Sequence, residues 1–287
     1  MNFGATLQKV RKNRQLTQKE LAHGIVQQGT YSRIERGQLP INAELLVQLV
    51  ERLNMTVNEF VYIHLHYQIS EHEKITRAFA DMDLTTPTEI KKHLAHAQRY
   101  IQQNSDDYIQ MLVQAYQSLL VLTEEGDLQQ ARILAEQIWA KMQRLDHWYI
   151  NDLELLNAII FLFPLDTAVE IVKTATKRLD MYENFYKDLT YLKIYFHLNL
   201  SILYLESKEY NTCIAMLDSI YQQFKKKLTY QTLGFIYTYK AICLFHLGRQ
   251  NEKEIHNLTT LMHLFDDEDN LTALLHVISS QCQLKSN

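Results

Sequence analysis

Few side chains in this sequence have the types and spacing that catalysis or metal binding needs. His64 and His66 lie two residues apart, and a second pair, His93 and His96, lies three apart. Neither pair has a carboxylate or cysteine that completes a ligand set at the usual spacing. The phosphate-cradling loops Gly-x-x-x-x-Gly-Lys and Gly-x-Gly-x-x-Gly do not occur. We therefore expect no enzyme activity, no metal and no cofactor.

Amide and guanidinium side chains near the N-terminus suit a different chemistry, namely hydrogen bonding to phosphates and to base edges. Residues 1–66 carry eight Lys and Arg against five Asp and Glu, whereas residues 67–287 carry 21 basic and 28 acidic residues. The overall charge of −4 conceals this asymmetry. An anionic partner such as nucleic acid is therefore indicated for the N-terminal part alone.

Short helices must position these side chains. Leu7 and Val10 share one side of a segment whose other positions are basic, which predicts an amphipathic helix. Thr17 and Glu20 have the spacing of a capping box, so a second helix begins at about residue 18 and ends near Gly24. Further helices are predicted in three places, at 28–36, at 44–53 and after a capping box at 56–59. Five short helices in this length make a compact bundle.

Two segments of this bundle, 16–22 (LTQKELA) and 31–37 (YSRIERG), occur together at the spacing of a known motif. They resemble the phage-repressor type (XRE) of helix-turn-helix domain. The resemblance implies that the third helix enters the major groove and meets base edges with its first turn, while basic side chains and helix N-termini hold phosphates. It places the DNA-contacting positions at Lys12, Gln18, Gln28, Gly29, Thr30, Arg33 and Arg36.

The resemblance also implies a role for individual contact residues. Paired hydrogen bonds let a Gln read adenine and an Arg read guanine, which are the roles implied for Gln28 and Arg33. Gln18, which opens the second helix, is implied to brace Gln28 and to touch a phosphate. Lys12 and Arg36 are interpreted either as phosphate contacts or as solvated charges.

Other residues of the third helix are interpreted as structural. Tyr31 and Ile34 lie where the family has core residues, and Glu35 resembles a buried acid that pairs with an Arg of the first helix, here Arg11. At the start of the helix, where the family usually has Ser or Thr, this chain has Gln27, which is a weaker cap. We expect the loss of Glu35 to destabilise the head rather than to alter its sequence specificity.

The hydrophobic pattern changes between His66 and Glu73, which indicates a domain boundary. Segment 86–89 (TPTE) combines an N-cap, a proline at the first helical position and an acid at the third, so a helix over 88–103 is predicted. Beyond it, apolar residues recur with helical periodicity in successive segments, which predicts pairs of helices of about 40 residues each. The sequence predicts an all-α protein with two parts, a five-helix helix-turn-helix domain at 1–66 and a tetratricopeptide-like, right-handed helical-repeat domain at 67–287.

A DNA-binding head followed by such repeats resembles the Rgg-type (MutR-like) regulators, which are peptide-pheromone receptors in the quorum sensing of Gram-positive bacteria. The resemblance implies a homodimer formed mainly through the C-terminal repeats and bound to a two-fold operator on double-stranded DNA. It also implies a short apolar peptide on the concave face of the repeats. In an alternative interpretation, the repeats of this regulator bind another protein or a small molecule.

Side chains on the predicted inner helices are candidates for contacts with such a peptide. Asn157 and Asn199 lie midway along two successive inner helices, where an amide can serve an extended backbone as donor and acceptor, or can link the two helices instead. Arg77 and Arg99 are candidates for pairing with a peptide carboxylate, with a solvated surface charge as the alternative. Tyr195 and Tyr237 are candidates for the apolar floor of the groove, with ordinary core packing as the alternative.

The sequence lacks both a run of about 18 apolar residues and an N-terminal signal pattern. We therefore expect neither a membrane span nor secretion, and place the protein in the cytoplasm. The three cysteines are too far apart for a disulfide framework or a zinc site and are interpreted as small apolar core residues: Cys213, Cys243 and Cys282.

Overall fold

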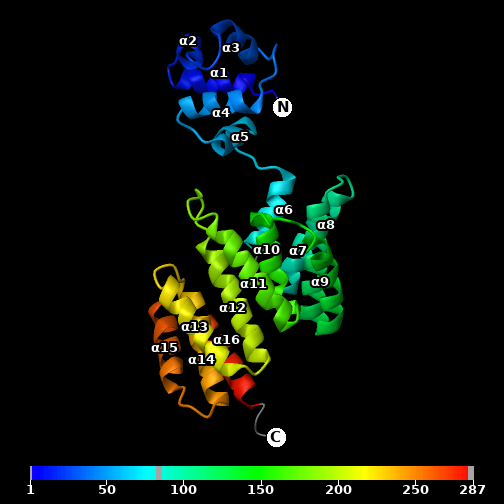
Figure 1. The fold of residues 1–287 in the computed structure, drawn as a ribbon, viewed down its shortest axis with the longest axis vertical. Coiled ribbons are helices and arrows are strands. Elements are labelled where there is room, and N and C mark those ends of the chain that lie inside the picture. Colours follow the sequence, from blue (N-terminus) through cyan, green and yellow to red (C-terminus); the bar gives the residue numbers. More distant parts are fainter. Residues whose placement is uncertain (1, 82–85, 284–287) are drawn as a thin grey trace. The chain divides into compact units, whose positions relative to one another are not determined.

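The computed structural model describes residues 2–81 and 86–283, and every regular element within these ranges is a helix (Figure 1). The chain forms two compact units, Met1–Lys74 and Ile75–Asn287, which we call the head and the repeat unit. The division falls within helix α6 (Glu71–Ala80), beyond the boundary at residue 66 expected from the sequence. The predicted all-α class is confirmed.

The head is a bundle of five short helices. Its centre is filled by side chains from α1, α3 and α5, of which Leu7, Tyr31 and Phe60 are fully buried. Thr17 and Glu20 form the predicted capping box, since each side chain accepts a hydrogen bond from the other residue's backbone N–H. The helices are α1 (Gly4–Asn13), α2 (Gln18–Ala22), α3 (Gln28–Glu35), α4 (Ala43–Arg52) and α5 (Val57–His64).

Two glycines turn the chain after α2 and after α3. Gly24 has φ +71° and Gly37 has φ +69°, a left-handed conformation in which a residue with a Cβ is strained. The predicted ends of both helices are thus confirmed, and the turn between α2 and α3 is held in a defined shape.

The repeat unit consists of helices joined mostly by short turns. Thr86 caps α7 and Pro87 is its first residue, as the sequence predicts. In the ranges that the structure describes, no helix is both long and apolar enough to cross a membrane. The helices after α6 are α7 (Pro87–Ile101), α8 (Asp107–Leu120), α9 (Leu128–Met142), α10 (Ile150–Ile159), α11 (Leu165–Asp180), α12 (Thr190–Glu206), α13 (Tyr210–Phe224), α14 (Tyr230–His246), α15 (Glu252–Leu264) and α16 (Glu268–Gln283).

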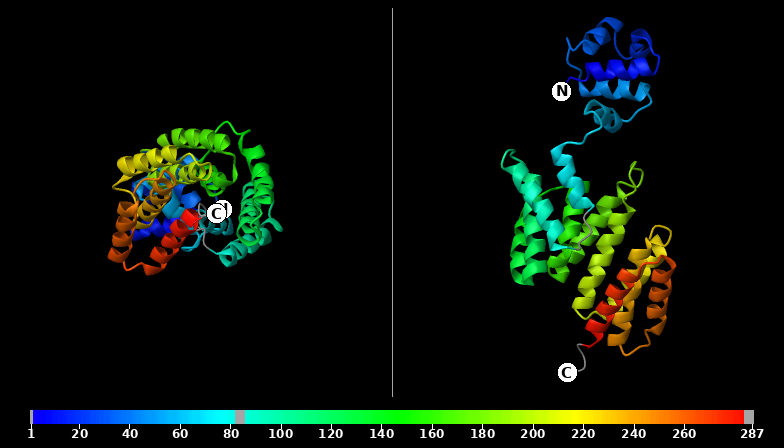
Figure 2. Two further views of the ribbon diagram at one scale, coloured as in Figure 1. Left: turned by 90° about the horizontal axis from the view of Figure 1, so that it is seen from below. Right: turned by 180° about the vertical axis from the view of Figure 1, so that it is seen from behind.

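One row of helices runs through the repeat unit. Helices α8, α10, α12, α14 and α16 each contact the next helix of this row, and α9, α13 and α15 each pack against its members. Seen end-on in the left panel of Figure 2, the repeat unit follows a curve. This is the arrangement of a helical-repeat solenoid, in which each pair buries its apolar faces against its neighbours.

Helix α12 joins the two hydrophobic cores of the repeat unit. Its residues Leu192 and Phe196 lie in the core that extends back to α6, whereas Ile194 and Leu198 lie in the core that extends forward to α16. A helix that is apolar on both sides must be buried on both sides. The predicted burial of the cysteines is confirmed for Cys213 and Cys243, which are fully buried, and Cys282 is half-buried against the second core.

Candidate DNA-binding surface and ligand hollow

Helix α3 has a buried side and an exposed side. Tyr31, Ile34 and Glu35 are buried, as the sequence predicts. The four candidate base contacts lie on the other side, where Gln28, Gly29 and Arg33 are exposed and Thr30 is half-buried. The helix therefore exposes polar side chains to solvent on one side while its other side packs into the head.

A buried ion pair fastens α3 to α1. The Arg11 guanidinium donates from Nε to Glu35 Oε1 at 2.6 Å and from NH2 to Oε2 at 3.0 Å, and its NH1 donates to the carbonyl of Leu16 at 2.6 Å. This two-pronged geometry fixes the angle between the two groups as well as their distance. The predicted pairing of Glu35 with Arg11 is confirmed.

The electrostatics of this pair favour its charged form. Burial by itself would raise the pKa of the Glu35 carboxyl, but the hydrogen bonds donated by Arg11 and Gln18 outweigh burial and hold the pKa below its ordinary value. The hydrogen bond to Glu35 in turn raises the pKa of Arg11. Both groups are thus ionised at neutral pH.

Gln18 joins the same network instead of bracing Gln28. Its side-chain nitrogen donates to Glu35 Oε2 at 2.8 Å, so the amide links α2 to the buried side of α3. A carboxylate is a stronger acceptor than a neutral amide, which explains why Glu35 takes this hydrogen bond. Gln18 remains half-buried at the start of α2.

The sequence reasoning missed a second anchor of the helix-turn-helix, Arg52. This last residue of α4 donates hydrogen bonds to the carbonyls of His23 and Leu21, at the end of α2. A cation at a helix C-terminus satisfies carbonyls that have no partner within the helix. The basic residue at the end of a predicted helix was the only signal in the sequence, and it did not reveal which carbonyls the side chain would reach.

The start of α3 has no side-chain cap, in agreement with the weak cap predicted at Gln27. The first-turn N–H groups of Gln28, Gly29 and Thr30 lack partners within the helix, as at any helix N-terminus. Such groups bind anions readily, and phosphates in particular. Lys12 and Arg36 are exposed, and Arg36 Nε donates to the carbonyl of Ser32 in its own helix.

The two candidate asparagines of the repeat unit contact each other. Asn199 Nδ2 donates to the backbone carbonyl of Asn157 at 3.1 Å and lies 3.2 Å from Asn157 Oδ1. The amides thus link α12 to α10, which is the structural role weighed above. Among the residues that the structure describes, Asn199 Oδ1 and Asn157 Nδ2 have no hydrogen-bond partner, and both residues are half-buried.

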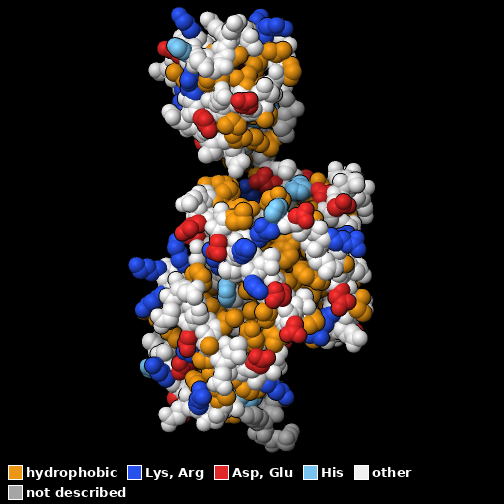
Figure 3. Space-filling model, viewed as in Figure 1, with side chains coloured by type: hydrophobic (Ala, Val, Ile, Leu, Met, Phe, Trp, Pro, Cys, Tyr) orange, Lys and Arg blue, Asp and Glu red, His pale blue; other side chains and the backbone are white. Residues whose placement is uncertain are grey.

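The structure does not gather the remaining peptide candidates at one place. Arg77 lies on α6 and Arg99 on α7, both exposed, and Arg99 Nε donates to the carbonyl of Ala95. Tyr195 on α12 is 38% exposed. Burial, aided by the nearby Tyr221 of α13, raises the pKa of Tyr237, which lies beside α13 and α15. Figure 3 shows apolar side chains over the middle of the visible face of the repeat unit, interrupted by charged ones.

A hollow of about 520 Å³ lies where α12, α14 and α16 end. We call it the C-terminal hollow. Apolar and aromatic side chains make up most of its wall, together with one carboxylate, that of Glu206. The lining includes Ile202, Glu206, Tyr239, Ile242, His246 and Val277. Tyr239 lines this hollow, whereas the sequence candidate Tyr237 is not among its lining residues.

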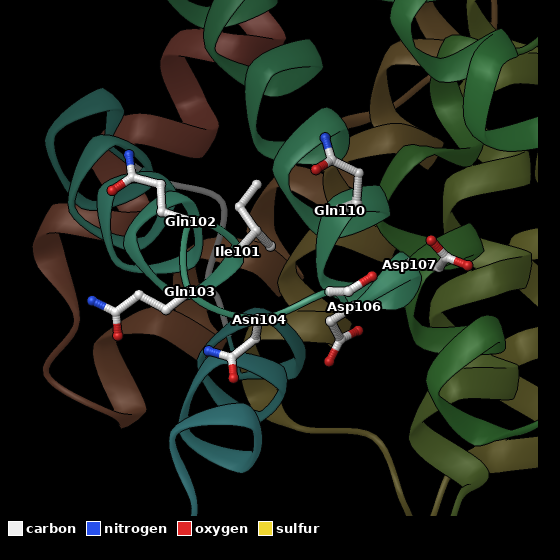
Figure 4. A pocket seen from close by; sticks show the side chains of 8 residues that line it. Ile101, Gln102, Gln103, Asn104, Asp106, Asp107 and Gln110 are labelled. Atoms are coloured by element: carbon white, nitrogen blue, oxygen red, sulfur yellow. The ribbon is translucent and has the colours of Figure 1, made fainter.

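A second hollow, of about 460 Å³, lies at the turn between α7 and α8. Its wall is polar and consists of the turn itself, residues 101–107, and Gln110. Figure 4 shows these side chains spread around the turn without converging on one point. Asp106 caps α8 by accepting a hydrogen bond from the backbone N–H of Ile109, so this hollow is a feature of the turn.

Residues 7–60 match the model of the helix-turn-helix family. The head is a helix-turn-helix domain. The predicted assignment of the XRE-type head is thereby confirmed, with α2 and α3 as the two helices of the motif. No curated protein sequence matches the chain significantly.

Solved structures match the fold over nearly the whole chain. Bacillus thuringiensis PlcR in complex with the peptide PapR7 and DNA has a TM-score of 0.68 at 15% identity, covering 95% of this chain and 98% of PlcR. The Streptococcus dysgalactiae SHP pheromone receptor Rgg2 has a TM-score of 0.65 at 14% identity, covering 97% and 99%. ComR from S. thermophilus in complex with DNA and its signalling peptide ComS has a TM-score of 0.62 at 12% identity, covering 97% and 99%. The expected resemblance to Rgg-type regulators is confirmed at the level of the fold.

Proposed function

We propose that this protein is a cytoplasmic, sequence-specific transcriptional regulator that binds a two-fold operator as a homodimer and takes a short apolar signalling peptide in its repeat unit. The separation of α3 into a buried side and an exposed side supports the DNA-binding half of this proposal. Base-reading side chains point outward from a helix whose inner side is fixed by the Arg11–Glu35 pair. A rigid helix is what allows hydrogen bonds to discriminate between bases.

Selection of bound sequences from random DNA duplexes tests this half with the full-length protein. Gln28→Ala and Arg33→Ala should relax the preference at individual base positions, because each removes a paired hydrogen bond. Lys12→Ala should weaken binding to all sequences and flatten its salt dependence. Arg144→Ala, at an exposed position of the repeat unit, is the control and should change neither. Unaltered base preferences in the Gln28 variant would refute the placement of α3 on DNA.

Dimeric binding follows from the size of the head. One recognition helix reads only a half-site, so useful affinity and specificity come from two heads on one duplex. Analytical ultracentrifugation on a palindromic duplex obtained from the selection should show two chains for each duplex. A single chain bound at saturation would contradict the proposed dimer.

The solved complexes of PlcR with PapR7 and of ComR with ComS support the peptide-binding half of the proposal. Helices α10 and α12 offer Asn157 Nδ2 and Asn199 Oδ1, which have no partner among the described residues, to a peptide backbone, and the C-terminal hollow offers an apolar wall to its side chains. An extended peptide must satisfy its backbone hydrogen bonds where it is buried. Thermal shift with a synthetic heptapeptide mixture, run beside a metabolite mixture, distinguishes a peptide from a small molecule. Stabilisation by metabolites alone would contradict the peptide.

A further inference from the structure

The C-terminal hollow has the charge pattern of a site for a cation. Glu206 is the last residue of α12, and its side chain lines the hollow beside the apolar side chains of Ile202 and Ile242. Among the described residues, no Lys, Arg or His forms an ion pair with it, and no hydrogen bond reaches its carboxylate. Glu206 is exposed to solvent, so its carboxylate is accessible to a cation whose stem packs on the apolar wall.

The helices around the hollow add negative charge to that of the carboxylate. Ile202 and Glu206 line it from the last turn or so of α12, His246 is the last residue of α14, and Gln281 lies near the end of α16. The C-terminus of an α-helix carries a partial negative charge. These three ends favour a positive group, whereas the N-terminus of α13, whose first residue Tyr210 also lines the hollow, opposes them.

The pKa values of the lining residues agree with this electrostatic picture. Desolvation by the surrounding side chains raises the pKa of the Glu206 carboxyl, and the positive charge of Arg132 partly offsets this effect. Burial, followed by the negative charge of Glu206, raises the pKa of Tyr239 to about 12, and both residues line the hollow. Lys208 also lines the hollow, yet it forms no ion pair with Glu206 in the part of the chain that the structure describes.

We propose that the C-terminal hollow binds a cationic group of the peptide ligand, an ammonium or a guanidinium, with Glu206 as its counter-ion and Tyr239 and Ile242 as the walls around its alkyl stem. Long cationic side chains pack their methylene groups on apolar surface and keep their charge at a polar group, which matches this lining. The inference rests on the proposed peptide binding and adds a charge requirement to it. Glu206 is thus a residue that determines ligand specificity.

Enrichment of peptides on the immobilised full-length protein tests the proposal. The probe is a synthetic heptapeptide mixture of random sequence, used once with free N-termini and once N-acetylated, and the bound peptides are sequenced by mass spectrometry. The parent should enrich peptides with Lys or Arg in both arms, or uncapped peptides in the first arm if the N-terminal ammonium is the ligand. Glu206→Gln should lose this preference, whereas Glu136→Gln, at an exposed position on α9, should keep it.

A double-mutant cycle makes the test quantitative. For one enriched peptide, replacing its cationic residue by norleucine, or acetylating the N-terminal amine in the second case, should lower affinity for the parent roughly tenfold or more. The same change should have little further effect on Glu206→Gln, because the two partners of one contact are coupled. The unliganded variant should melt no lower than the parent, since the carboxylate has no partner to lose.

The outcomes separate this inference from the proposed function. Peptides enriched without a cation preference, or with a preference that Glu206→Gln keeps, would overturn the inference and leave peptide binding in place. A variant that melts lower than the parent would assign Glu206 a structural role and also overturn it. No enrichment of any peptide by the parent would overturn the peptide half of the proposed function, and the inference with it.

Discussion

Replacing Glu35 with alanine should strongly destabilise the head, because the substitution leaves a buried guanidinium without its partner. The Glu35 side chain is fully buried and that of Arg11 is 9% exposed. Three hydrogen bonds of 2.6 to 3.0 Å end on the carboxylate, two from Arg11 and one from Gln18. Removing one partner of a buried pair costs about 3–5 kcal/mol.

Thermal unfolding of the full-length protein measures this loss. For a domain the size of the head, 1 kcal/mol shifts the melting temperature by about 4–8 °C, so a loss of about 3 kcal/mol should lower the transition of the head by at least about 12 °C. Hydrogen exchange in α3 should rise in parallel and assign the change to the head. Glu51→Ala, at an exposed position on α4, is the control and should change the stability by less than about 0.5 kcal/mol.

A double variant distinguishes loss of the ion pair from loss of packing. Arg11→Met combined with Glu35→Leu removes both charges and should recover most of the stability, since apolar residues can replace a buried pair at little cost. If the head of Glu35→Ala had the same melting temperature as the head of the parent, the ion pair would not hold α3 in place. If the double variant were as unstable as the single one, the loss would lie in side-chain packing rather than in an unpaired charge.

The remaining predictions concern the pH dependence of the head and two hydrogen bonds between elements. The pKa of Glu35 is held below its ordinary value in the folded head, so its contribution to stability is present above that ordinary value and is lost as the pH falls through the folded pKa. Measured by denaturant unfolding, Glu35→Gln should therefore lose less stability on acidification than the parent. Equal losses in the two proteins would refute the assignment. Arg52→Ala should lower the stability of the head by roughly 1–2 kcal/mol and speed hydrogen exchange around Gly24, whereas unchanged exchange there would mean that the turn holds without the bond to His23. Asn199→Ala should cost the repeat unit about 1 kcal/mol in denaturant unfolding through the lost link to Asn157, and a parent-like midpoint would show that this link contributes nothing.

Helix ends in this protein could be predicted because the chemistry that sets them is local. The capping box of Thr17 and Glu20 and the cap of Thr86 each span three residues, so both partners are visible in a short segment. The buried side of α3 was also predicted, because the resemblance to a known domain places Tyr31 and Ile34 in the core. The pairing of Glu35 with Arg11 came from the resemblance to a known domain, which supplies tertiary information indirectly.

Only the tertiary structure decided which partner each polar side chain takes. Gln18 and Glu35 are 17 residues apart, and nothing between them in the sequence marks the pair. For Asn157 and Asn199, which are 42 residues apart, the sequence left open whether the amides serve a peptide or link the two helices, and the structure shows the link. The C-terminal hollow exists only because three helices end at one place, where Glu206, Tyr239 and Gln281 meet. A helix's own sequence sets its apolar face and its ends, whereas the crossing of separate helices sets the distances between their side chains, and hydrogen bonds and charge interactions depend on those distances.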